Sequence, residues 1–225
     1  MPTVTALEQL WQQVSSRPLW APPNFRRYVL LREQMRLKLI DPKRVNILAP
    51  AGMVNDCTSC LDNCCIGRRS IVLLRLRDIA TLIDLKREYL INIEKPQFTT
   101  EEVSGRIALQ RQVNSDSWQT FPVLAQNRYF ACKALTDTGQ CSLYPNWPLA
   151  CARFPYAFDL ESKEAFFSHR CDSYWIRHDG RVDDHIEAMK QAAVASYNER
   201  IKDSILLAYA KDRLKELGLM RFLQL

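Results

Sequence analysis

The 225-residue sequence has no apolar run long enough to cross a bilayer, since the stretch from Ile71 to Leu74 is broken by Arg75. A transmembrane helix needs about 20 consecutive apolar residues, so no membrane span is predicted. The N-terminal residues also lack the basic start and apolar core of a secretion signal. We therefore expect a cytoplasmic protein, in which cysteine thiols stay reduced.

Glycine is scarce, with 6 residues, which argues against a low-complexity chain and against a glycine-rich dinucleotide-binding fold. The sequence contains no GxxxxGK[ST], no GxSxG and no HExxH, the signatures of common nucleotide-binding, hydrolase and zinc-protease sites. The CxxxCxxC pattern of radical-SAM enzymes begins with Cys60 and Cys64, but Gly67 stands at its third position. The sequence therefore leaves open whether the protein is an enzyme.

Cysteine is abundant and concentrated, with 8 residues in two groups. The first group is Cys57, Cys60, Cys64 and Cys65, and the second is Cys132, Cys141, Cys151 and Cys171. In a reducing compartment, thiols in such a pattern are more often metal ligands than disulfides. Scattered buried cysteines that act as small hydrophobic residues would not explain the CxxCxxxCC run. We predict that the two groups meet around metal and that all eight cysteines are ligands.

Thiolates are soft anionic ligands that suit zinc, Cu(I) and iron–sulfur clusters. Cys57 and Cys60 have the spacing of a turn that binds one ion through two sulfurs. The side chains of the adjacent Cys64 and Cys65 diverge, so they need not face the same metal atom. Either one of them is a thiol that lies behind the ligands, or the site is polynuclear and each sulfur reaches a different metal. Eight thiols are compatible with two four-thiolate sites or with one larger cluster.

Several thiolates around a divalent ion leave net negative charge, which nearby cations must offset. Arg68, Arg69 and Arg153 lie close in sequence to the cysteines and are the candidates for this cofactor-binding role. The alternative is that these three are ordinary surface arginines with no role at the metal. His169 could replace a thiol as ligand, although an imidazole beside a ligand is more often hydrogen-bonded behind it.

The hydrophobic pattern predicts a mostly helical α+β fold, with a small Cys-rich metal-binding core of short strands flanked by N- and C-terminal helices. Residues 1–50 form a helical segment with a basic face, residues 51–175 the Cys-rich domain, and residues 176–225 a C-terminal helix that packs on the core. Helices are expected at the start of the chain with a Thr5–Glu8 capping box, and at about 24–40, 76–90, 99–113 and 183–219. Strands are expected at 71–74 and 128–132, with hairpins at 128–144 and 156–168, and one helical turn after Pro148. Residues 45–56 are expected to form a loop.

The predicted helix at 24–40 has a basic face that continues through Lys43 and Arg44. The segment from 24 to 44 holds seven basic and two acidic residues. A solvated helix face would explain this charge, and an acidic protein partner is the functional alternative. Nucleic acid is a less favoured partner because the aromatic residues of a nucleic-acid module are not interleaved with the basic ones.

The cysteine pattern resembles that of the YkgJ-type cysteine-cluster family, whose members are described as zinc- or iron-chelating. The run Cys57-x-x-Cys60-x-x-x-Cys64-Cys65 is similar to the family signature. The second match comprises Cys132-Lys-Ala-Leu, Gly139-Gln-Cys141-Ser-Leu-Tyr144, Pro148-Leu-Ala-Cys151 and Phe154-Pro155. The resemblance covers about residues 55–172. The chain departs from the pattern at Trp147 and Ala152, where the family usually has arginine, and in the three residues before its Cys-Cys pair.

The resemblance implies a protein that holds iron–sulfur or zinc. The eight thiols with arginines nearby lead us to expect a cytoplasmic metal-cluster protein, with [4Fe–4S] favoured over zinc. Such a protein would act in electron transfer, in sensing or as a cluster-bearing subunit. One branch of the family, similar to the flagellin lysine methylase FliB, uses S-adenosylmethionine, so a lysine N-methylase-like enzyme is the first alternative. A structural zinc protein that docks a partner through its basic helix is the second.

Overall fold

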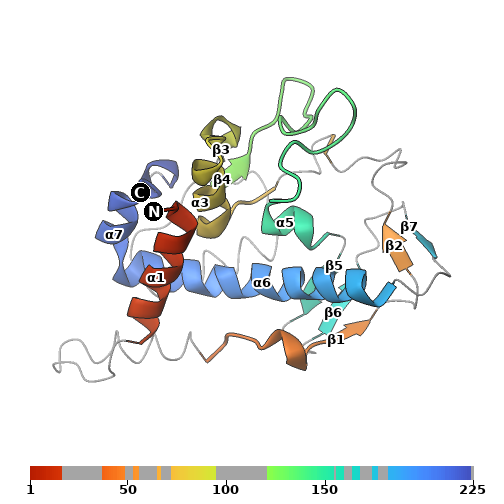
Figure 1. Cartoon of the computed structure of the whole chain (residues 1–225), viewed down its shortest axis with the longest axis horizontal. Coiled ribbons are helices and arrows are strands. Elements are labelled where there is room, and N and C mark those ends of the chain that lie inside the picture. The colour runs from red at the N-terminus through yellow and green to blue at the C-terminus, as the bar shows by residue number, and fades with distance from the viewer. Residues whose placement is uncertain are drawn as a thin grey trace. The chain divides into compact units, whose positions relative to one another are not determined.

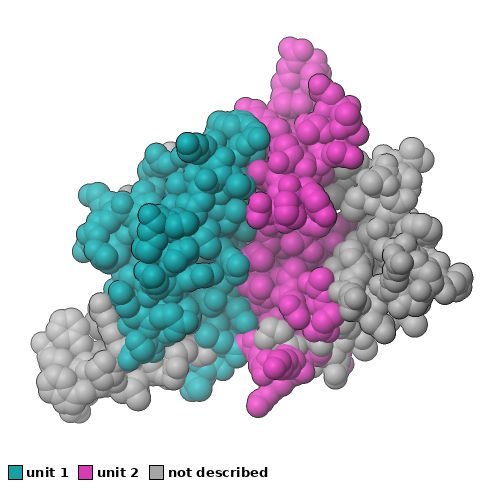
Figure 2. Space-filling view, in the orientation of Figure 1, with its two compact units in different colours: residues 1–39, 74–123, 198–225 teal, residues 40–73, 124–197 magenta. Residues whose placement is uncertain are grey.

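The chain folds into helices and small sheets that form two compact units (Figures 1 and 2). The computed structural model describes residues 1–16, 37–48, 53–55, 65–66, 72–94, 121–154, 156–159, 164–167, 174–176 and 182–223. Unit 1 comprises residues 1–39, 74–123 and 198–225, and unit 2 comprises residues 40–73 and 124–197. Each unit is therefore assembled from segments that are far apart in the sequence.

Unit 1 is built mainly from helices. Its helices are α1 (Thr3–Ser15), α3 (Leu76–Asp84), the last part of α6 (Val182–Tyr209), α7 (Lys211–Glu216) and the 3-10 helices at Glu88–Leu90 and Met220–Phe222. Its strands are β3 (Ile91–Glu94) and, except for its last residue, β4 (Phe121–Leu124), which pairs with β3. The side chains of Val14, Ile79, Ile205 and Leu214 are completely buried. Burial of such apolar side chains is the main force that holds these helices together.

The helix expected at the start of the chain is confirmed as α1, which buries the predicted face of Leu7, Leu10 and Val14. Its predicted capping box is wrong, because the helix begins at Thr3 and Thr5 lies inside it. The carboxylate of Asp84, at the end of α3, instead accepts hydrogen bonds from the N–H groups of Thr3 and Val4. A distant residue thus satisfies backbone donors that the local sequence was expected to satisfy.

Unit 2 holds most of the strands. Strands β1 (Asn46–Leu48), β6 (Glu164–Phe167) and β5 (Tyr156–Asp159) form one sheet, with β1 parallel and β5 antiparallel to β6. Strands β2 (Met53–Asn55) and β7 (Tyr174–Ile176) form an antiparallel pair. The hairpin expected at 156–168 is confirmed, whereas the loop expected at 45–56 is wrong, since it contains β1 and β2. Both strands pair with partners more than a hundred residues away, which no local pattern reveals.

Several predicted boundaries also differ from the structure. The described end of the helix expected at 24–40, Leu37–Ile40, is a turn followed by irregular backbone, and the helix expected at 76–90 ends at Asp84. The long C-terminal helix is interrupted at Ala210, which separates α6 from α7. The strand expected at 128–132 is a turn up to Phe130. The helix expected at 99–113 lies outside the described residues.

The mixed helix-and-strand class of the fold is confirmed. The helical turn expected after Pro148 is also confirmed, as α5 (Leu149–Ala152). Within the described parts of the chain, no helix combines the length and apolar character that crossing a bilayer requires. The metal-binding core itself stays a prediction.

Candidate metal centre

Two consecutive hairpins of the same design precede Cys132 and Cys141, two cysteines of the second group. In the first, Asn127 N–H donates to the carbonyl of Ala131 at 2.8 Å, and Phe130 N–H donates to the carbonyl of Asn127 at 3.0 Å. In the second, Thr136 N–H donates to Gln140 at 2.8 Å, and Gly139 N–H to Thr136 at 2.9 Å. Both are three-residue loops whose last residue has positive φ. This segment is the green trace between β4 and α5 in Figure 1.

A side chain at the start of each hairpin reinforces its loop. Asn127 Oδ1 accepts hydrogen bonds from Tyr129 N–H at 2.8 Å and from Ala131 N–H at 3.1 Å. Thr136 Oγ1 accepts one from Gln140 N–H at 3.1 Å. The turn expected at 136–139 is thus confirmed. The first turn was missed because its sequence contains no glycine, although Asn127 is a residue that favours such side-chain to main-chain bonds.

The first group of cysteines reaches the second through Cys65. Ile66 and Ala131 form an antiparallel bridge, and the N–H of Cys132 donates to the carbonyl of Cys65 at 2.7 Å. In this register Cys65 lies directly opposite Cys132, and opposed residues of an antiparallel pair project to the same face. The backbone therefore brings one cysteine of each group together across 67 residues of sequence.

Cys141 and Cys151 lie later in the segment that contains Cys132. Cys141 forms an antiparallel bridge with Leu135, whose N–H donates to the carbonyl of Cys132 at 3.0 Å. Cys151 lies in α5, and its N–H donates to the carbonyl of Pro148 at 2.8 Å. Cys65, Cys132, Cys141 and Cys151 are all partly buried thiols, and all belong to unit 2. The residue ranges of unit 1 contain no cysteine in the sequence.

Half of the predicted ligand set is not described. Cys57, Cys60, Cys64 and Cys171 lie outside the described residues, as do Arg68, Arg69 and His169. Within the described segments alone, no three His, Cys, Asp or Glu side chains come together as a group that could hold a metal ion. The eight-cysteine metal set therefore stays a prediction.

Arg153, the third predicted cation, follows α5 and is partly buried. Its Nη1 donates to the carbonyl of Tyr156 at 2.9 Å. Tyr156 is itself buried, and burial raises the pKa of its hydroxyl. Arg153 thus helps to join α5 to β5, and its role beside a metal stays a prediction.

The predicted basic face is described only at its end. Lys43 and Arg44 lie in the 3-10 helix Pro42–Arg44, and both are exposed, as is Lys38. Arg44 is 3.9 Å from the carboxylate of Asp41, which is a weak, solvated ion pair. The basic residues from Arg26 to Arg36 lie outside the described residues, and the acidic partner expected there stays a prediction.

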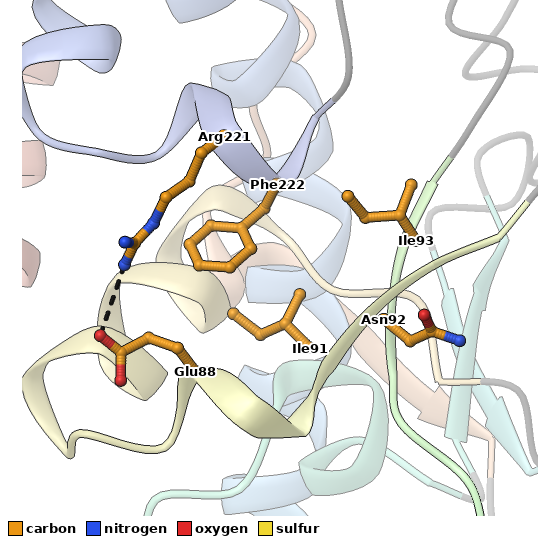
Figure 3. Close-up of a pocket in the computed structure, with 6 residues that line it drawn as sticks. All are labelled: Glu88, Ile91, Asn92, Ile93, Arg221 and Phe222. Atoms are coloured by element: carbon orange, nitrogen blue, oxygen red, sulfur yellow. Dashed lines mark hydrogen bonds and ion pairs between the residues drawn. The ribbon is translucent and has the colours of Figure 1, made fainter.

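Unit 1 contains an open hollow of about 490 Å³ (Figure 3). It is lined by Glu88, Ile91, Asn92, Ile93, Arg221 and Phe222. Arg221 lies 3.4 Å from Glu88 and 4.6 Å from the Phe222 ring. The one cation and one carboxylate of this hollow neutralise each other. The hollow offers no thiol, so it is separate from the predicted metal chemistry.

Comparison with known proteins adds no relative. No protein-family model, no curated protein and no solved structure matches the chain.

Proposed function

We propose that this protein holds a metal centre through cysteine thiolates of unit 2, with an iron–sulfur cluster as the favoured occupant. The observation that carries the proposal is the opposition of Cys65 and Cys132, fixed by the 2.7 Å hydrogen bond between their main chains. A shared centre requires the two cysteine groups to meet, and this register joins them at one point.

The character of the thiols supports the same proposal. Four of them are partly buried, so they are shielded from bulk water and yet not enclosed in an apolar core. Buried apolar surroundings would disfavour the thiolate form that metals require. The fixed hairpins of residues 127–131 and 136–140 would hold the ligands of such a centre in place before metal binds.

A bound cluster would supply reversible one-electron chemistry or oxidant sensitivity. Accordingly, we propose a role in electron transfer, in sensing or as a cluster-bearing subunit. The residues of this chain would supply the thiolate ligands, and Arg153 and the two arginines at positions 68 and 69 would offset their negative charge.

The test is to purify the full chain without oxygen and to measure iron, acid-labile sulfide, zinc and the visible absorption spectrum. We expect iron and sulfide in matching amounts, with a broad absorption near 400 nm (about the wavelength of thiolate-to-iron charge transfer) that dithionite bleaches. Colourless protein with stoichiometric zinc would remove the iron–sulfur assignment but keep a thiolate metal site. Protein that binds none of these metals would overturn the proposal.

A further inference from the structure

The loop Arg128-Tyr129-Phe130 is exposed and rich in aromatic side chains. The exposed fractions of Tyr129 and Phe130 are 67% and 44%, and that of Ile66 is 55%. Because Ile66 bridges to Ala131, it lies beside the base of the same loop. Exposed apolar residues scattered singly need no explanation, but two on one hairpin and a third on the segment bridged to it form a local apolar surface.

Phe130 occupies a backbone conformation that suits glycine better than an aromatic residue. Its φ is +62°, and the equivalent position of the neighbouring hairpin is Gly139 with φ +77°. Glycine adopts this conformation without steric cost, whereas a residue with a bulky side chain is strained there. The two hairpins share one hydrogen-bond design, so the backbone at position 130 also suits glycine. The phenylalanine costs stability and yields an exposed ring, a combination typical of a binding residue.

The conformation of the loop is also restrained by hydrogen bonds and by a cation–π contact. The two hydrogen bonds to Asn127 Oδ1 fix the backbone on both sides of Phe130. The guanidinium of Arg128 lies 4.7 Å from the centre of the Tyr129 ring, which restrains both side chains. A surface that is ordered in advance loses less entropy when a partner binds.

The charged side chains of the described segment from Arg128 to Lys133 are both positive. Arg128 and Lys133 are exposed, and neither makes an ion pair with the described residues. The sequence from 118 to 136 contains these two cations and no acidic residue. A complementary partner therefore presents carboxylates around an apolar patch.

We infer that the 127–131 hairpin, with Ile66, Arg128 and Lys133, is a docking surface for an acidic protein segment that carries apolar side chains. Tyr129 and Phe130 would be its anchors, because exposed aromatic residues with a neighbouring arginine dominate many protein interfaces. This surface includes no residue of the basic 24–44 segment, and the inference does not require that the protein bind metal.

The experiment uses the full chain and a displayed library of 12-residue peptides composed of Asp, Glu, Leu, Phe and Gly, beside a matched library with Lys in place of the acids. We expect the acidic library to yield binders and the basic one none. Phe130→Gly should raise the Kd of the selected peptides about tenfold. Its melting temperature should be unchanged or higher, since glycine suits the backbone at this position. Arg128→Glu should weaken binding in the same direction.

The matched control is Tyr89→Ala in unit 1. Tyr89 is 61% exposed and has Arg87 5.9 Å from its ring, so it repeats the chemistry of Tyr129 at an unrelated place. Its loss should leave peptide binding unchanged. A failure of the acidic library to yield binders, or an unchanged Kd in Phe130→Gly, would overturn the inference. Tighter binding of a (dT)12 oligonucleotide than of the peptides would also overturn it. Metal content measured on the same samples keeps this result separate from the metal proposal.

Discussion

The carboxylate of Asp84 binds the N-terminus of α1: its Oδ1 lies 2.6 Å from Thr3 N, and its Oδ2 lies 3.0 Å from Val4 N. Asp84 is the last residue of α3, so one helix ends where it caps the start of another. The first N–H groups of a helix have no partner within it, and the helix dipole attracts negative charge to this end. This contact ties two helices that are 81 residues apart in sequence.

Replacement of Asp84 by asparagine should therefore destabilise unit 1. The variant keeps one hydrogen-bond acceptor but loses the charge and one of the two charge-assisted bonds, which we expect to cost about 1 kcal/mol in unfolding free energy. Denaturation by urea, followed by circular dichroism, measures the loss. Thr5→Ala is the control, because Thr5 lies within α1 and not at its cap. An equal loss in Thr5→Ala would contradict the assignment of the cap to Asp84.

The same contact should make the stability of unit 1 depend on pH in the acid range. Burial alone would raise the pKa of the Asp84 carboxyl. The hydrogen bonds from Val4 and Thr3 and the N-terminal charge lower this pKa by more than burial raises it, so it lies below its ordinary value of 3.8. A depressed carboxyl pKa contributes stability that is fully present above 3.8 and is lost as the pH falls through the folded-state value.

Urea titrations of the wild type and of Asp84→Asn, from pH 6 down to about pH 2, measure this dependence. The difference between their unfolding free energies should be constant near neutral pH and shrink below 3.8. A difference that does not change with pH would show that the carboxylate charge contributes nothing.

A second remote carboxylate serves α3 in the same way. Asp203, on α6, is only 1% exposed, and its oxygens lie 3.3 and 3.4 Å from the N–H of Leu76 at the start of α3. Asp203→Ala should cost about 1–3 kcal/mol, because it leaves this buried N–H without an acceptor. Asp212→Ala, in the first turn of the short helix α7, is the comparison and should change the unfolding free energy by less than about 0.5 kcal/mol. Equal effects of the two substitutions in thermal and urea unfolding would refute the special role of Asp203.

Local periodicity predicted the helices of this chain better than their ends. Leu7, Leu10 and Val14 repeat at helical spacing, and they form the buried face of α1. The start of α3 at Leu76 was predicted from the sequence. The start of α1 could not be, because Asp84 acts on it from a segment that is remote in sequence. Short strands such as β2 were missed for the same reason, since each exists only where its distant partner supplies hydrogen bonds.

The candidate site illustrates the same limit. Spacing alone drew attention to the cysteines, because no common structural role explains the CxxCxxxCC run. It could not show that Cys65 is the cysteine of the first group that meets Cys132, since this depends on the antiparallel register at Ile66. The turn before Cys132 was predicted as strand because Phe130 occupies a conformation that usually calls for glycine.

The register of Cys65 and Cys132 leads to the prediction that tests the metal centre most directly. Cys65→Ser and Cys132→Ser each remove a thiolate but keep the main-chain groups that join the two segments, so the hairpin should persist. If both sulfurs bind metal, each variant should lose at least about tenfold in metal affinity. Loss of a residue that only hydrogen-bonds to a ligand already costs about tenfold or more, and loss of a ligand should cost no less. Iron and sulfide analysis of anaerobically purified protein, with a chelator titration, measures the change.

Ser142→Ala is the matched control on the same hairpin segment, because the Ser142 N–H bond to Ala134 belongs to the main chain and survives the substitution. It should keep the metal content and the circular dichroism of the wild type. The double variant of Cys65 and Cys132 should lose little more metal than either single variant, because two ligands of one centre act as a unit. Independent, additive losses would place the two sulfurs on different metal atoms, and wild-type metal content in both single variants would remove them from the ligand set.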